Sequence, residues 1–90
     1  MLYTLICLDK PGALEIRKAN REAHLAYIND TGVVEQAGPF LDDEGAMIGS
    51  LVVLKVETQE AAQDWANGDP YAKAGLFDSV QIMPWKRVIG

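Results

Sequence analysis

The segment 12-GALEIRKANREAHLAYINDT-31 decides how the rest of the chain is interpreted, and it contains the only histidine, His24. With residues placed at about 100° intervals, its small and apolar side chains fall on one arc. The residues of this arc are Ile16, Ala19, Ala23, Ala26 and Tyr27. The opposite arc carries Lys18, Glu22 and Asn29. The spacing therefore predicts a helix over residues 14–30 that packs its first arc against a sheet and turns its second arc to water.

A third stripe of this helix consists of Arg17, Arg21, His24 and Ile28, at steps of four, three and four residues. Side chains at such steps stack along one flank of a helix. Two arginines and a histidine beside a core-facing arc could line a pocket for an anionic or oxygen-rich ligand. The alternative is a solvated flank whose arginines pair with nearby carboxylates.

Length and composition restrict the class of protein. The chain has 90 residues, 49% of them hydrophobic, and we expect one folded domain over residues 1–90. A formal net charge of −5 argues against a nucleic-acid-binding protein, which needs a basic patch. The single cysteine, Cys7, excludes an internal disulfide, and its strand-like surroundings favour an inert buried thiol. We find no transmembrane or signal segment and expect a soluble, cytoplasmic protein with no membrane partner.

The order of predicted elements gives the fold class. Gly32 is suited to a left-handed cap for the first helix, and Thr58 to the N-cap of a second. The other elements are strands at 2–8, 33–37, 50–57 and 79–85, a helix at 59–67, a helical turn at 72–75 and a tail at 86–90 that could add an edge strand. The order strand–helix–strand–strand–helix–strand predicts an α+β, ferredoxin-like βαββαβ fold. Its four-stranded antiparallel sheet has both helices on one face.

This arrangement leaves one face of the sheet without helices, yet the strands at 2–8 and 50–56 are apolar on both faces. The uncovered face needs a partner surface. The simplest cover is a second copy of the same sheet, so we predict a homodimer with its sheets face to face.

The connection 40–49 carries three successive acidic residues, Asp42, Asp43 and Glu44. Loops of this length are often functional, and carboxylates can bind a divalent metal. However, adjacent acidic residues lack the alternate spacing of a calcium loop, and no second histidine is present. We therefore favour a solvated acidic loop and predict no metal site.

Asp69 follows the second helix in the sequence Gly68-Asp69-Pro70-Tyr71, and it has two interpretations. A carboxylate at a helix exit can simply cap a turn. Alternatively, Asp69 pairs with His24, since both helices lie on the same face of the sheet. A carboxylate bonded to one imidazole nitrogen orients the ring and presents the other nitrogen as a base. Ser50, at the predicted start of the third strand, either plays a local role or donates a hydrogen bond to a substrate oxygen.

These residues resemble the YciI-like (YCII-related) family over nearly the whole chain. The resemblance rests on Arg17…Arg21…His24-Leu25, Gly38-Pro39, Gly49-Ser50 and Ala61-Ala62-Gln63…Trp65…Asp69-Pro70-Tyr71…Gly75. It implies a ferredoxin-like fold assembled as a dimeric α/β barrel, with a His24–Asp69 pair as the proposed catalytic centre. Arg17, Arg21, Ser50 and Tyr71 are then candidates for substrate binding. One branch of the family resembles dehydrochlorinases of chlorinated hydroquinone breakdown, and the wider fold includes muconolactone isomerases and small monooxygenases.

Three functions remain open from the sequence. The first is a cofactor-free enzyme in which His24 removes a proton from a small oxygenated ring compound, Asp69 orients His24, and Arg17 or Arg21 holds the developing negative charge. The reaction would be an elimination or an isomerisation. The second is a non-catalytic module, dimeric and either small-molecule-binding or stress-associated. The third is a structural or interaction domain.

Overall fold

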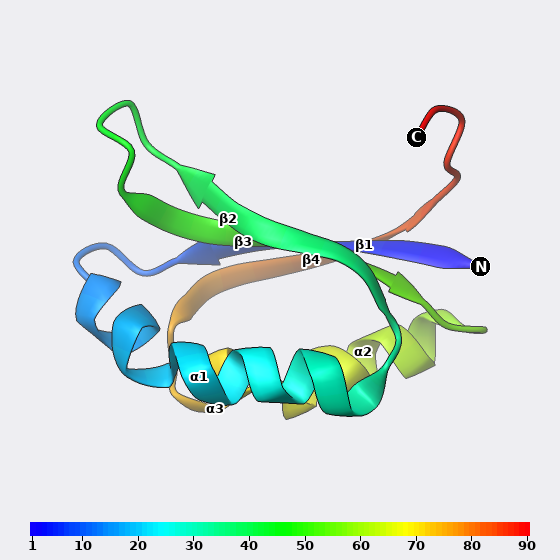
Figure 1. The fold of residues 1–90 in the computed structure, drawn as a ribbon, viewed down its shortest axis with the longest axis horizontal. Helices are drawn as coiled ribbons and strands as arrows, with labels where there is room; N and C mark the ends of the chain where they lie inside the picture. The colour runs from blue at the N-terminus through cyan, green and yellow to red at the C-terminus, as the bar shows by residue number, and fades with distance from the viewer.

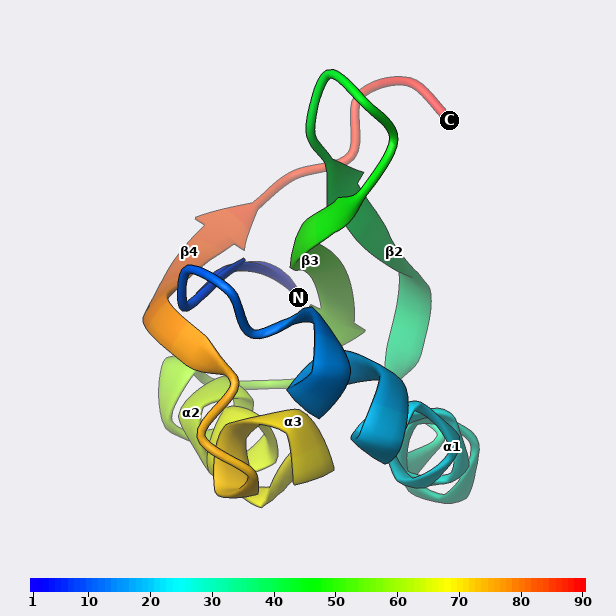
Figure 2. The same ribbon diagram turned by 90° about the vertical axis from the view of Figure 1, so that its left-hand side faces the viewer.

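The computed structural model describes residues 1–90 and contains a four-stranded sheet with three helices against one face (Figures 1 and 2). Its elements are β1 (Leu2–Asp9), α1 (Leu14–Thr31), β2 (Val34–Leu41), β3 (Met47–Lys55), α2 (Gln59–Gly68), α3 (Pro70–Lys73) and β4 (Phe77–Trp85). The strands lie in the order β2-β3-β1-β4, and every neighbouring pair is antiparallel. The predicted ferredoxin-like architecture is confirmed.

The hydrophobic core lies between the sheet and the helices. Alternate residues of β1, namely Tyr3, Leu5 and Cys7, are buried on the helix side. In the register of β1 with β3, Leu54 lies opposite Tyr3 and Val52 lies opposite Leu5. The helices add the buried side chains of Ala62, Trp65 and Ala66. No helix covers the other face of the sheet (Figure 1).

Two predicted helix caps are confirmed. Gly32 ends α1 in the left-handed conformation with φ 66°, which costs a glycine little. The Thr58 hydroxyl accepts a hydrogen bond of 3.0 Å from the Ala61 N–H and so satisfies one of the free N–H groups at the start of α2. None of the helices has both the length and the apolar composition that crossing a bilayer requires.

The second strand is longer than predicted, and the third, predicted at 50–57, lies at Met47–Lys55 and so both begins and ends earlier. β2 continues through Gly38 and Pro39 to Leu41, and β3 already begins at Met47. Proline normally ends a strand because it has no N–H to donate, but β2 is an edge strand, where one N–H per pair of residues faces away from the ladder. The connection predicted over residues 40–49 is therefore only a short turn between Leu41 and Met47. In this turn the Asp42 carboxylate accepts hydrogen bonds of 2.9 Å from the N–H groups of Glu44 and Ala46.

Smaller differences occur near the C-terminus. The helical turn predicted at 72–75 lies at Pro70–Lys73, and β4 begins two residues earlier than expected, at Phe77. The predicted fifth strand at 86–90 does not form. Val88 and Ile89 of this tail are 83% and 91% exposed. The C-terminal tail extends to the side of the sheet away from the helices (Figure 1).

The side of α1 that faces the sheet differs from the predicted one. The alanine-rich arc was predicted to be buried, but Ala19, Ala23 and Ala26 are exposed. The buried residues of α1 are instead Arg17 and His24, from the stripe predicted to be a flank. Helical periodicity assigns charged side chains to water, and it fails here because both residues have buried carboxylate partners elsewhere in the chain.

α1 is fixed against α2 by two hydrogen bonds. The Tyr27 hydroxyl donates to the Trp65 carbonyl oxygen at 2.8 Å, and Trp65 Nε1 donates to the Thr31 hydroxyl at 2.9 Å. The Tyr27 ring lies so close to Gly68 that a Cβ atom there would collide with its hydroxyl. Because Gly68 directly precedes Asp69, this contact fixes the position of Asp69 relative to α1.

Burial of the Cys7 thiol makes stability depend on pH. Burial, reinforced by the charge of Asp69, raises the pKa of Cys7 from 9.0 to about 12. The unfolded chain releases this proton above pH 9.0, whereas the folded chain retains it to about pH 12. We therefore expect the free energy of unfolding to fall as the pH rises from 9.0 to about 12, because the unfolded chain is stabilised by loss of the Cys7 proton. The decrease due to Cys7 is up to about 1.4 kcal/mol per pH unit.

Urea unfolding between pH 8 and 10.5 measures this slope, and Cys7→Ala is the control. In Cys7→Ala, the free energy of unfolding should fall less steeply with pH, because only the other titrating groups contribute. Equal slopes for the two proteins would contradict the prediction.

Candidate active site

The only histidine forms a buried hydrogen bond with Asp69. His24 Nδ1 lies 2.7 Å from Asp69 Oδ1, and the two residues are 6% and 3% exposed. Since a carboxylate only accepts hydrogen bonds, Nδ1 carries the proton and donates it. This leaves Nε2, on the other side of the ring, without a partner in the protein.

The local backbone explains how Asp69 reaches His24. Pro70 restricts the preceding residue to an extended conformation, and Asp69 has φ −63° and ψ 126°. Its Oδ1 atom also accepts a hydrogen bond of 3.0 Å from the Tyr71 N–H, which caps α3. The two interpretations of Asp69 are therefore not alternatives, since one oxygen both caps a helix and orients His24.

Tyr71 holds the imidazole ring by stacking. The two ring centroids are 3.9 Å apart and the planes differ by 15°. Burial raises the pKa of Tyr71 above its usual value, although the positive charges of Arg17 and Arg21 act in the opposite direction. The hydroxyl is therefore protonated at neutral pH.

Arg17 forms a buried ion pair with Asp9. Its Nε and Nη2 atoms donate to the two oxygens of Asp9 at 2.7 and 2.8 Å, and Nη2 also donates to the Ser50 hydroxyl at 2.9 Å. Its guanidinium lies 4.8 Å from the centre of the Tyr71 ring. Burial acts to lower the pKa of Arg17, but its bond to Asp9 outweighs this effect and the pKa is raised.

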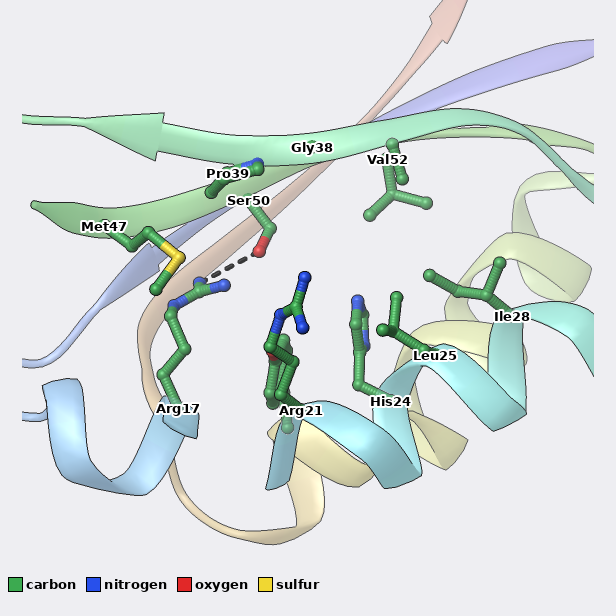
Figure 3. A pocket seen from close by; sticks show the side chains of 12 residues that line it. Arg17, Arg21, His24, Leu25, Ile28, Gly38, Pro39, Met47, Ser50 and Val52 are labelled. Carbon is green, nitrogen blue, oxygen red and sulfur yellow. Dashed lines mark hydrogen bonds between the residues drawn. The ribbon is translucent and has the colours of Figure 1, made fainter. Parts of the chain in front are cut away.

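These side chains surround a cavity of about 210 Å³ between α1 and the edge formed by β2 and β3 (Figure 3). Arg21 and His24 extend from α1 towards the strands, and Ser50 points down from β3. Arg21 is exposed and makes no ion pair, so it is a free cation at the cavity. The apolar part of the lining consists of Leu25, Ile28, Ala37, Pro39, Met47 and Val52.

The structure brings all six predicted site residues together, because His24, Asp69, Arg17, Arg21, Ser50 and Tyr71 lie in or directly behind this cavity. The acidic turn at Asp42–Glu44 is not part of it. No three residues among the His, Cys, Asp and Glu side chains are grouped closely enough to hold a metal ion.

Sequence reasoning missed Asp9, which was attributed to the turn Asp9-Lys10-Pro11-Gly12. A carboxylate at the end of a buried strand, eight residues before an arginine, was the available signal. It also missed the apolar wall from Ala37 and Pro39, because the second strand was predicted to end at Ala37.

The YCII-related domain profile matches residues 1–86. The chain belongs to the YCII-related family. The protein YciI of Escherichia coli O6:H1 is 41% identical over an alignment that covers 98% of this chain and 99% of that protein. An uncharacterized Haemophilus influenzae protein is 38% identical with the same coverage. The family predicted from the His24 and Asp69 motifs is thus confirmed.

A solved structure similar to this YCII-related chain has a named activity and a bound ligand. It is the 5-chloro-2-hydroxyhydroquinone dehydrochlorinase TftG from Burkholderia phenoliruptrix AC1100, in complex with 2,5-dihydroxybenzoquinone. The two chains are 33% identical and superpose with a TM-score of 0.87, over 96% of this chain and 94% of the other.

Proposed function

We propose that this protein is a cofactor-independent enzyme that removes a proton from a small oxygenated ring compound and so catalyses an elimination or an isomerisation. The observation that carries the proposal is the buried His24–Asp69 hydrogen bond beside a cavity that His24 lines. A general base needs a free lone pair within reach of a ligand. The proposal is supported because Nδ1 and not Nε2 is bonded to Asp69, and because His24 lines the cavity.

In the proposed reaction, Nε2 of His24 takes a proton from a substrate hydroxyl or from a carbon next to a carbonyl group. The electron pair left behind either expels a leaving group such as chloride or is protonated at another ring carbon. Asp69 keeps the imidazole in the required tautomer and stabilises the imidazolium that forms. Arg21, the unpaired cation of the cavity, stabilises the negative charge that develops on a substrate oxygen.

The size and lining of the cavity support a small ring as substrate. Its volume of about 210 Å³ is below the roughly 300 Å³ at which pockets for drug-sized ligands begin. Apolar residues cover one part, and polar side chains from α1, β3 and α3 converge on the other. The TftG neighbour, named for a chlorinated hydroxyhydroquinone and bound to a dihydroxybenzoquinone, supports the same substrate class.

The proposed activity is tested by incubating the protein with 5-chloro-2-hydroxyhydroquinone under anaerobic conditions and measuring released chloride. We expect saturable chloride release that falls by about 10²- to 10⁴-fold in the His24→Asn variant. Binding of the compound without any turnover would favour the alternative, a non-catalytic small-molecule-binding or stress-associated module.

We also propose that the protein is a homodimer joined through the helix-free face of the sheet, as in a dimeric α/β barrel. This face presents Leu8, Met83 and Trp85, which are 44%, 50% and 39% exposed, beside Ile6 and Leu51. Large exposed apolar faces mark interaction surfaces, and a second copy of the same sheet is the cover that the family resemblance implies.

A charge at the centre of this face should break the dimer. Leu51 lies opposite Ile6 on β1 and Gly38 on β2, so Leu51→Lys places an ammonium in the middle of the proposed interface. We expect sedimentation velocity to show a dimer for the unmodified protein and a monomer for Leu51→Lys. Ala23→Lys, on the exposed outer side of α1, is the control and should remain dimeric. A monomeric unmodified protein would contradict the proposal.

A further inference from the structure

The Ser50 hydroxyl is the only side-chain oxygen that β3 contributes to the cavity lining. Ser50 is 4% exposed and its Oγ atom accepts a hydrogen bond of 2.9 Å from Arg17 Nη2. An arginine has donors and no acceptor, so the direction of this bond is fixed. The hydroxyl proton of Ser50 cannot point towards Arg17.

Arg17 cannot turn away to change this arrangement. Its Nε and Nη2 atoms are both bonded to Asp9, and the side chains of the pair are 3% and 5% exposed. A bidentate guanidinium–carboxylate pair has a defined planar geometry. Asp9 thus fixes Arg17, and Arg17 fixes the oxygen of Ser50.

The Ser50 hydroxyl proton makes no hydrogen bond to any acceptor in the protein, since the only bond to this side chain is the one from Arg17. A buried hydroxyl donor is costly to leave unpaired. Ser50 lines the cavity and projects into it from the strand side, opposite the helix that carries His24 (Figure 3). A ligand in the cavity is the partner that this geometry offers to the proton.

We propose that Ser50 is a specificity-determining residue that donates its hydroxyl proton to an acceptor oxygen of the ligand, with Asp9 and Arg17 as its positioning residues. The inference rests on the proposed function and deepens it. The substrate must present an acceptor oxygen to Ser50 and a proton to His24 Nε2. An amino group in place of the acceptor oxygen is a poor acceptor and gains little from this proton.

Two neutral compounds of the same shape separate this role from a general structural one. Hydroquinone carries two oxygens that can accept a hydrogen bond, whereas 1,4-phenylenediamine carries two amino groups that are poor acceptors. The dissociation constants of both are measured anaerobically at pH 8 by NMR titration, with the unmodified protein, Ser50→Ala and Ser79→Ala. Ser79, on exposed β4, is the control.

We expect Ser50→Ala to weaken hydroquinone binding by about 3- to 10-fold and to leave phenylenediamine binding unchanged, while Ser79→Ala changes neither. Equal weakening of both compounds, or no change, would overturn the role of Ser50 and leave the proposed function standing. If the unmodified protein binds neither compound, the proposed substrate class is wrong and the inference falls with it.

Discussion

Replacing His24 with asparagine is expected to lower kcat/KM for chloride release by about 10²- to 10⁴-fold, the usual contribution of a positioned general base. The amide nitrogen of asparagine lies close to where Nδ1 of histidine lies, so the variant retains a donor for Asp69 and loses the basic Nε2. Because His24 is buried, this choice also avoids leaving the Asp69 carboxylate without a partner. The measurement is the initial rate of chloride release at several substrate concentrations.

The matched control is Ala23→Asn, which introduces the same residue at the neighbouring, exposed position of α1. This variant should keep its activity within a factor of two or so, since Ala23 lies outside the cavity. If His24→Asn is folded and as active as Ala23→Asn, His24 takes no part in the reaction.

Replacing Arg17 with methionine is expected to lower the free energy of unfolding by about 3–5 kcal/mol, because it leaves the Asp9 carboxylate buried without its partner. Such a loss is a large part of the roughly 5–15 kcal/mol by which most domains are stable. Urea unfolding followed by tryptophan fluorescence measures the change, since Trp65 lies in the core.

Arg21→Met supplies a matched control on the same helix. Arg21 is exposed and makes no ion pair, so its replacement should change the stability by no more than about 0.5 kcal/mol. The double variant Asp9→Leu/Arg17→Met should recover most of the lost stability, because no buried charge remains unpaired. Equal stabilities of Arg17→Met and Arg21→Met would show that the buried Arg17–Asp9 pair does not contribute to stability as proposed.

Local hydrogen bonding and turn chemistry made parts of the fold predictable. The caps at Gly32 and Thr58 depend only on residues within one helical turn, and both are present. The order of elements followed from the same local signals. The path of β2 through Pro39 was not predictable in this way, because whether a proline is tolerated depends on the edge position of the strand in the finished sheet.

In the candidate site, too, features set by neighbouring residues were predictable, and features set by distant residues were not. Arg17 and His24 could be recognised as one stripe of a helix, but periodicity assigned them to a flank and not to the buried face. Their burial depends on Asp9 and Asp69, and His24 and Asp69 are 45 positions apart in the sequence. Only the folded chain shows that two carboxylates accept hydrogen bonds from Arg17 and His24, and therefore that this side of α1 can face the sheet.

We propose that Asp69 holds His24 with its proton on Nδ1 and leaves Nε2 free as a base. A long-range ¹H–¹⁵N correlation spectrum of the single imidazole, recorded at alkaline pH, shows which ring nitrogen carries the proton. We predict a protonated Nδ1 and an unprotonated Nε2 in the unmodified protein, with the proton moving towards Nε2 in Asp69→Ala. A proton on Nε2 in the unmodified protein, the form that free histidine prefers, would show that Asp69 does not hold His24 as the base.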